Sequence, residues 1–341
     1  MAEQKRKSKM ILKIIIGFII VLCLLLLAAF INHRIKLKSD KSLLEPIGQL
    51  VEVDGENMCV YTEGEGEITI VFMSGGGTPS PILDFKTLYT QLSDEYKIAV
   101  VEKFGYGFSD DSNRSRDIDT MLEDTRNALS KADVQAPYVL CPHSLSGLEA
   151  VYWAQKYPDE VSAIIGLDMA APEYYTDLKI STAILKLNQV LCEMGLVRLI
   201  SESVNIMYKN SELTENELSI IKALYSRRCV SEAVVNEAKS CIENAEIITE
   251  KGMPNVPVLM FISNAEGINY DKESWIKTSL NYAENLKNGK YIQLDCPHYV
   301  HNEEHIKIAD EIKAFLDQQL NNLLVDLNAI FITQLGIRLL M

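Results

Sequence analysis

Apolar positions along the chain form one long run and several short ones. The long run, residues 14–31, holds 18 consecutive apolar residues, and as a helix it would be about 27 Å long, close to the hydrocarbon thickness of a membrane. We expect a basic segment over 1–13, an anchor in the lipid bilayer over 14–31 and a polar stem over 32–48. No small-residue cleavage site follows the run, which favours an uncleaved signal anchor.

Basic residues on the two sides of this run indicate its orientation. They number five before it and four after it, and positive charge favours the cytoplasmic side. The slight excess before the run predicts an N-terminus inside the cell and a main domain outside the cytoplasm. The residues are Lys5, Arg6, Lys7, Lys9 and Lys13 before the run, and Arg34, Lys36, Lys38 and Lys41 after it.

The short apolar runs are unbroken rather than alternating, which is typical of parallel strands buried on both faces. Helical periodicity fills most of the gaps between them, so the pattern predicts an α/β protein with a doubly wound, mostly parallel sheet. Asp54-Gly55 favours a tight hairpin turn, so the sheet begins with an antiparallel edge. The expected strands are 49–53, 56–61, 68–73, 97–101, 138–141, 163–167, 258–262 and 291–294.

One gap, between Leu167 and Val258, is too long for a crossover and has helical periodicity throughout. We interpret 172–253 as a helical cap inserted into a core formed by 49–171 and 254–320. It would lie at the edge where the strands end and where ligands bind in such sheets. The remaining residues, 321–341, form an apolar extension to which no role is assigned.

Charge is distributed unevenly and narrows the class of function. The net charge is −14, made up of +7 over residues 1–41 and −21 over the rest. Such an acidic body excludes nucleic acid as a partner, because that affinity comes largely from basic side chains. The seven cysteines are scattered without a C-x-x-C pair, so neither a disulfide framework nor a zinc site is expected. The sequence leaves the oligomeric state open.

The stretch from Tyr138 to Pro158 contains the chemistry around which the chain is organised. An apolar strand leads into the tight bend PHSLSG, and a helical period follows from Leu145. A serine on a sharp turn between a strand and a helix is the layout of a nucleophile elbow. Ser144 is therefore the candidate nucleophile.

A serine nucleophile needs a base, and histidine is the usual one. His33 lies beside the apolar run, and His143 is the neighbour of Ser144, with a side chain expected to point away from the site. Of the later histidines, His298 follows the last expected strand, in a loop at the strand ends. We choose His298 as general base.

Two carboxylates are candidates for the acid that orients this histidine. Asp168 follows the strand 163–167 directly, and Glu266 lies shortly after the strand 258–262. Asp168 is the shorter residue at a buried strand end, where an ionised carboxylate needs a partner, and it is preferred narrowly. Glu266 stays the alternative, with Asp271 behind both.

Glycines after the strand 68–73 provide candidates for an oxyanion hole. Gly75, Gly76 and Gly77 follow it, and glycines let backbone amides approach a substrate closely. We expect the amides of Gly76 and Leu145 to form the hole. A second glycine loop, 104–110, would shape the wall of the cleft, and no Gly-Lys-Ser/Thr marks it as a phosphate loop.

Together, SGGG, EKFGYGFSD, PHSLSG, the helical insertion, PVLMFISN and CPHYVHNEE resemble the α/β-hydrolase family over about residues 49–320. The resemblance implies a capped serine hydrolase of the esterase kind. It would cleave a carboxylic ester, with an amide as the alternative substrate, through an acyl-enzyme and without a metal or organic cofactor. It makes Ser144 the nucleophile, His298 the base, and Leu145 with the 75–77 loop the oxyanion donors. The family commonly takes its acid after the later strand, which favours Glu266.

Some features depart from this pattern and support other hypotheses. Pro142 and Ser146 replace the glycines of G-x-S-x-G, and Pro297 stands where a glycine commonly precedes the histidine. An inactive relative that only binds a ligand is therefore an alternative. The stretch from His301 to His305 also fits H-x-x-E-H, a zinc-peptidase pattern. A helix that starts at Asn302 would leave His301 outside it, which argues against that hypothesis.

Overall fold

The computed structural model describes residues 2–176, 178, 180–200, 203–228, 230–268 and 271–321. Within them, eight strands form one sheet in the order β1-β2-β4-β3-β5-β6-β7-β8. β1 and β2 form an antiparallel hairpin and β2 pairs antiparallel with β4, while the other neighbours are parallel. The strands are β1 Gln49–Val53, β2 Glu56–Glu63, β3 Thr69–Met73, β4 Lys97–Glu102, β5 Tyr138–Pro142, β6 Val161–Leu167, β7 Val258–Ile262 and β8 Gly289–Gln293. The predicted mostly parallel sheet is confirmed.

Both faces of the sheet are buried, which explains the unbroken apolar runs. In β3, Val71 and Met73 pack on one face, against α4 and α5, whereas Ile70 and Phe72 pack on the other, against α3 and the C-terminal helix 305–321. Successive strand residues point to opposite faces, so each strand must be apolar throughout. The helices of the two layers are α2 Pro81–Asp84, α3 Lys86–Tyr89, α4 Ile118–Lys131, α5 Gly147–Lys156, α11 Lys272–Asn285 and α12 Val300–Glu303.

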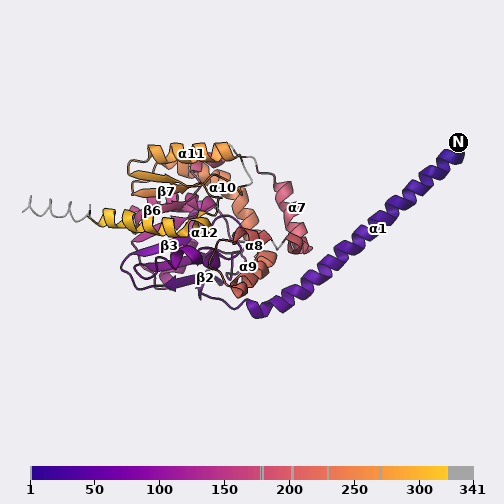
Figure 1. Cartoon of the computed structure of the whole chain (residues 1–341), viewed down its shortest axis with the longest axis horizontal. Coiled ribbons are helices and arrows are strands. Elements are labelled where there is room, and N and C mark those ends of the chain that lie inside the picture. The colour runs from indigo at the N-terminus through magenta and orange to yellow at the C-terminus, as the bar shows by residue number, and fades with distance from the viewer. Residues whose placement is uncertain are drawn as a thin grey trace, which may run out of the picture.

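The chain between β6 and β7 is helical and lies on one side of the sheet (Figure 1). Its longest helix, α10, packs against α5 and α6, and Cys241, Ala245 and Ile248 join the main core. α8 and α9 form a smaller apolar cluster with Leu83 of α2. These elements are α6 Pro172–Thr176, α7 Thr182–Glu193, η4 Leu196–Ile200, α8 Ser203–Met207, α9 Glu215–Arg228 and α10 Glu232–Lys251.

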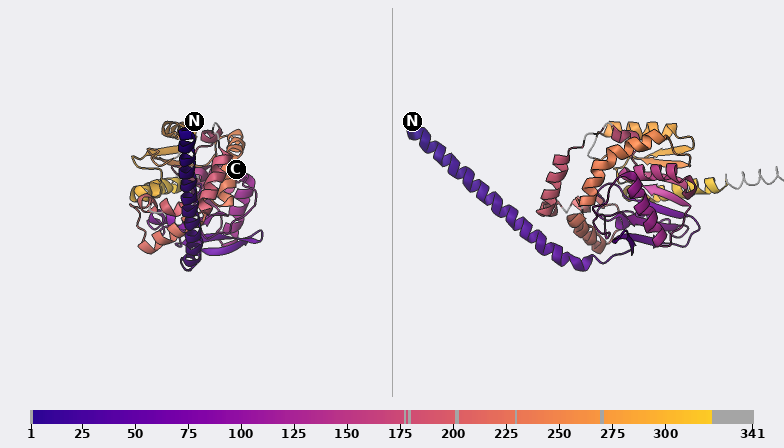
Figure 2. Two further views of the ribbon diagram at one scale, coloured as in Figure 1. Left: turned by 90° about the vertical axis from the view of Figure 1, so that its right-hand side faces the viewer. Right: turned by 180° about the vertical axis from the view of Figure 1, so that it is seen from behind.

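Among the described residues, one helix is long and apolar enough to cross a membrane, and it is α1, Ala2–Ser39. It projects from the domain on the same side as α7, whereas the C-terminal helix lies on the far side (Figures 1 and 2). α1 continues beyond the apolar run, and a short 3-10 helix, η1 Asp40–Leu43, follows it. Most of the predicted stem is therefore helical. The predicted extension 321–341, apart from Asn321, and Cys229 lie outside the described residues.

Candidate active site

Ser144 lies at the end of β5 in a conformation that raises its side chain above the sheet. Its backbone φ is +53°, in the left-handed region that L-residues adopt rarely. Such strain is maintained only where the surrounding structure enforces it, as at functional sites. A short 3-10 turn, η2 Ser144–Ser146, follows, and then α5 begins. A strand, a tight turn that carries this strained serine and a helix have the geometry expected of a nucleophile elbow.

The two residues that replace glycines in the elbow are accommodated by specific contacts. Pro142 is the last residue of β5, in register with Met73, where a missing amide is tolerated at a strand end. The Ser146 hydroxyl donates hydrogen bonds to the carbonyls of Met73 (2.6 Å) and His143 (2.9 Å). The close approach falls instead at Gly147, where a Cβ would lie 2.5 Å from the Ala170 carbonyl oxygen.

The structure brings three of the predicted site residues into one hydrogen-bonded chain. The hydroxyl of Ser144 lies 2.9 Å from Nε2 of His298, and Nδ1 of His298 lies 2.5 Å from Oδ2 of Asp168. Asp168 is 1 % exposed and also accepts bonds from the Ser263 amide (2.9 Å), the Ser263 hydroxyl (2.6 Å) and Trp275 Nε1 (3.2 Å). The buried carboxylate is therefore fully satisfied by hydrogen-bond donors, which fix its orientation toward His298.

The alternative acids lie elsewhere. The Glu266 side chain is exposed, and its contact with the site is its backbone carbonyl, which accepts from the His298 amide (2.8 Å). Asp271 caps α11 by accepting from the Ser274 amide (2.7 Å). Asp168 alone of the three candidates therefore contacts the imidazole of His298.

The glycine loop approaches the elbow as an oxyanion hole requires. A Cβ on Gly75 would lie 2.9 Å from the Cβ of Ser144, and one on Gly76 would lie 3.1 Å from the Leu145 side chain. Among the described residues the amides of Gly76 and Leu145 have no hydrogen-bond acceptor, so both are available to a substrate oxygen. The Gly77 amide instead donates to the Tyr106 hydroxyl (3.1 Å).

A cavity of about 390 Å³ opens above Ser144 and is lined mainly by apolar side chains. Its floor contains the glycine loop, Ser144 and His298, and its walls come from the segment between β6 and β7 and from Trp275 of α11. The size and lining are those of a site for a small organic molecule with an apolar part. The apolar wall includes Leu145, Tyr175, Ile180, Leu185, Val230, Val234, Val235, Ala238, Cys241 and Ile268.

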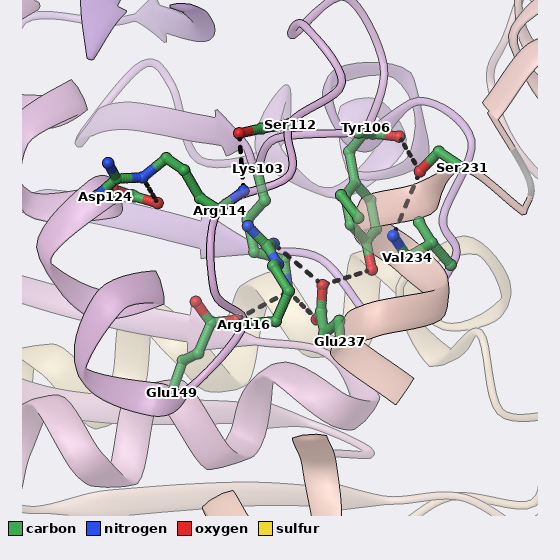
Figure 3. A network of polar contacts seen from close by, with 12 residues as sticks. Lys103, Tyr106, Ser112, Arg114, Arg116, Asp124, Glu149, Ser231, Val234 and Glu237 are labelled. Atoms are coloured by element: carbon green, nitrogen blue, oxygen red, sulfur yellow. Dashed lines mark hydrogen bonds and ion pairs between the residues drawn. The ribbon is translucent and has the colours of Figure 1, made fainter. Parts of the chain in front are cut away.

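A buried ionic network joins α10 to the core beneath this cavity (Figure 3). Glu237 of α10 accepts hydrogen bonds from Lys103 (2.5 Å), Arg116 (3.2 Å) and Tyr106 (3.0 Å), and Lys103 also donates to Glu149 of α5 (2.8 Å). The Tyr106 hydroxyl therefore links Glu237 to the glycine loop. Sequence patterns did not identify this network, because its members lie on four separate segments and each resembles an ordinary surface charge.

Electrostatics explain why these charges persist in the interior. Burial opposes ionisation of Glu237, but Lys103 and Arg116 more than compensate and lower its pKa below the ordinary value. Burial likewise opposes the charge on Lys103, and Glu149 and Glu237 outweigh it and raise its pKa. Each charge thus depends on its partners, and removal of one leaves another unpaired in the interior.

A second buried polar cluster lies behind His298. The ring centroids of His143 and His298 lie 4.6 Å apart. Nε2 of His143 donates a hydrogen bond to the backbone carbonyl of His298 (3.2 Å). His301 donates to Asp84 (3.1 Å), which also accepts from Tyr208 (2.7 Å). Burial, with a smaller contribution from His298 and His301, lowers the pKa of His143 well below 6.5, so this ring is neutral.

Two histidines and a carboxylate lie close together behind the candidate site. Among the described residues, Asp84, His143 and His301 place ligand atoms within 4.8 Å of one another, but His301 and Tyr208 already occupy the Asp84 carboxylate. The two histidines of H-x-x-E-H have different surroundings. His301 lies inside α12, which begins at Val300 and not at Asn302 as expected. Nε2 of His305 lies 3.7 Å from Oε1 of Glu212. The two side chains thus have different carboxylate partners.

Comparison with known proteins agrees with this architecture. No family model matches the chain. Cfl2 from Burkholderia cenocepacia superposes with a TM-score of 0.63 at 19 % identity, covering 78 % of this chain and 94 % of that one. The enol-lactonase from Burkholderia xenovorans LB400 superposes with a TM-score of 0.59 at 15 % identity, covering 79 % and 100 %. The protein has the α/β-hydrolase fold.

Sequence similarity defines a narrower group. The chain is 40 % identical over 257 residues to the uncharacterized protein YbdG of Bacillus subtilis (strain 168), an alignment that covers 73 % of this chain and 79 % of YbdG. It belongs to the same family as YbdG.

Proposed function

We propose that the protein is a serine hydrolase that cleaves a carboxylic ester, with an amide as the alternative substrate, and that Ser144, His298 and Asp168 are its catalytic triad. The observation that supports this most directly is the continuous chain of hydrogen bonds from the Ser144 hydroxyl through His298 to Asp168. It lies at the floor of an apolar cavity. The enol-lactonase among the structural neighbours has a name that denotes hydrolysis of a cyclic ester.

The proposed reaction has two halves. The Ser144 oxygen attacks the carbonyl carbon while His298 Nε2 takes the hydroxyl proton, and Asp168 stabilises the imidazolium. The amides of Gly76 and Leu145 bind the oxyanion. The bond from carbonyl carbon to leaving oxygen then breaks, and His298 returns the proton to the departing alcohol. Water, deprotonated by His298, next attacks the acyl-enzyme and releases the acid and the Ser144 hydroxyl.

We further propose that α1 anchors the enzyme in a membrane as an uncleaved signal anchor, with the domain on the extracytoplasmic side. The support is the length and apolarity of α1 and the slight excess of basic residues before its apolar run. Protease protection in sealed cells, with an epitope at each end of the chain, tests the orientation. Digestion of the domain from inside the cell only would overturn it.

A fluorophosphonate probe tests the mechanism, because it reacts with an activated serine. The full chain in detergent micelles is expected to be labelled, Ser144→Ala to lose the label completely, and His298→Ala to be labelled far more slowly. Ser146→Ala is the matched control, since its hydroxyl lies two residues away and only contacts carbonyls. Equal labelling of Ser144→Ala, or none of the parent chain, would favour a protein that binds a ligand without cleaving it.

A further inference from the structure

The outer surface of the segment between β6 and β7 is unusually apolar. α7 contains three leucines, an isoleucine and a valine, yet none of the side chains over its residues 182–193, all described, is buried. Such a surface on a water-soluble domain marks a site of contact with something apolar. The residues that are at least half exposed here are Ile184, Leu187, Val190, Leu199, Ile200 and Ile206, and we call them the cap face.

α7 also borders the cavity of the candidate site. Leu185 and Asn188, one turn apart on the neighbouring side of this helix, line the cavity above Ser144. Residues 184 and 187 lie next to them along the same helix and point outward. α7 therefore separates the cavity from whatever covers the cap face, and it forms part of the rim through which a substrate must pass.

The turn that follows α7 packs against the end of the apolar run of α1. Gly195, in the turn after α7, packs so closely on α1 that a Cβ there would lie 2.3 Å from the His33 Cβ and 3.2 Å from the Ala29 carbonyl oxygen. Ala29 belongs to the run 14–31. Arg198 of η4 fixes the contact through His33 (3.0 Å) and Asp40 (2.9 Å).

A groove lies between α1 and the segment that walls the cavity. It measures about 270 Å³ and runs between His33, Arg34 and Leu37 of α1 and residues of α7, α9 and α10. Val230 lines both the groove and the cavity above Ser144. The groove and the cavity are therefore neighbours, with Val230 at their common border.

We propose that the cap face rests in the interfacial layer of the membrane that anchors α1, and that the cavity receives a lipophilic acyl ester directly from that membrane. An amphipathic helix lies in this layer with its apolar side toward the acyl chains. Arg34, Lys36 and Lys38 are exposed just beyond the run, where long basic side chains at a helix end reach the lipid headgroups. The substrate class rests on the proposed hydrolase function, whereas the membrane contact does not.

Tryptophan quenching tests the contact without reference to activity. The full chain is reconstituted into phosphatidylcholine–phosphatidylglycerol vesicles with or without bromine on the acyl chains. Leu187→Trp and Leu199→Trp are compared with Ile306→Trp, a matched control that is 51 % exposed on the C-terminal helix, against 56 % for Leu187. The two native tryptophans, Trp153 and Trp275, are buried and supply a constant background.

We expect brominated lipid to reduce the fluorescence added by Leu187→Trp and Leu199→Trp at least about twofold, because interfacial helices insert several ångströms deep. The Ile306→Trp signal should change little. Equal quenching at all three positions would overturn the proposal. So would an unquenched signal from Leu187→Trp together with cross-linking of Leu187→Cys between two chains, which would identify a second copy as the partner.

A kinetic comparison tests the substrate route. Ile184→Ser combined with Leu187→Ser should raise the KM for a long-chain ester dissolved in vesicles about tenfold, through lost apolar contact. The same variant should hydrolyse a water-soluble short-chain ester at the parental rate, and Ile306→Ser should leave both unchanged. An equal loss on both substrates would indicate a merely structural role and refute the route. If the parent cleaves no ester, the hydrolase proposal fails while the quenching result still decides the contact.

Discussion

Two helices of the segment between β6 and β7, α10 and α7, are held in opposite ways. α10 is attached to the core by apolar packing and by the buried contacts of Glu237 with Lys103 and Arg116, whereas α7 has an exposed apolar face and contacts α1 through the turn at Gly195. α10 is thus a fixed wall of the cavity. α7 depends on its surroundings for a partner that covers its apolar face.

The largest effect in this comparison is expected when the charge of Glu237 on α10 is removed. Glu237→Ala leaves Arg116 buried without its carboxylate and Lys103 with Glu149 as its remaining carboxylate partner, and we expect the free energy of unfolding to fall by about 3–5 kcal/mol. Urea denaturation of the full chain in detergent micelles measures it. Glu243→Ala, on the exposed side of the same helix, should change stability by less than about 0.5 kcal/mol. Equal losses would show that the network contributes nothing.

Low pH should decrease the free energy of unfolding. The His143 ring stays neutral when folded, because burial holds its pKa well below 6.5. Below about pH 6.5 the unfolded chain binds a proton that the folded chain does not, so stability falls as the pH decreases. One such group contributes about 1.4 kcal/mol per pH unit.

The measurement is the free energy of unfolding at about pH 6.5 and pH 5.5, the pH range in which an unfolded histidine takes up its proton. His143→Gln retains a donor for the His298 carbonyl and should show a correspondingly shallower dependence. Unchanged pH dependence in that variant would contradict the assignment.

Tyr106 tests whether the fixed wall also serves the chemistry. Tyr106→Phe removes the hydroxyl that joins Glu237 to the Gly77 amide, so the glycine loop loses a support next to the amide of Gly76. We expect kcat on a short-chain ester to fall about tenfold, less than for loss of an oxyanion donor itself, with KM nearly unchanged. Tyr291→Phe, on the far edge strand β8, is the control. A rise in KM alone would assign Tyr106 to substrate binding instead.

The smallest effect is expected for a substitution on the exposed face of α7. Leu187→Ala should alter the free energy of unfolding in detergent by less than about 0.5 kcal/mol, because its side chain makes no buried contact. Ile248→Ala, at a fully buried position of α10, should lose about 2–5 kcal/mol. Comparable losses at the two positions would show that α7 packs as tightly as α10 and would remove the contrast.

Periodicity and residue order predicted the sheet well, because a strand buried on both faces must be apolar throughout. They also selected Ser144 and His298, since a tight turn and a loop at strand ends are visible in local sequence. The choice between Asp168 and Glu266 depended on side-chain direction at two neighbouring strand ends, which spacing does not encode. The contact between Lys103 and Glu237 was not predicted for another reason. The two residues are 134 positions apart in the sequence, and no local pattern connects them.

The stiffness of α1 has a consequence for kinetics. α1 runs as one helix through the apolar run to Ser39, and the turn at Gly195 packs directly on it. If α1 spans a membrane as proposed, the domain would be held at a nearly constant position at the lipid surface. Under the proposed topology the enzyme would search a surface rather than a volume. Its rate would then follow the mole fraction of substrate among the lipids, and dilution of the vesicles at constant composition would leave turnover per enzyme unchanged.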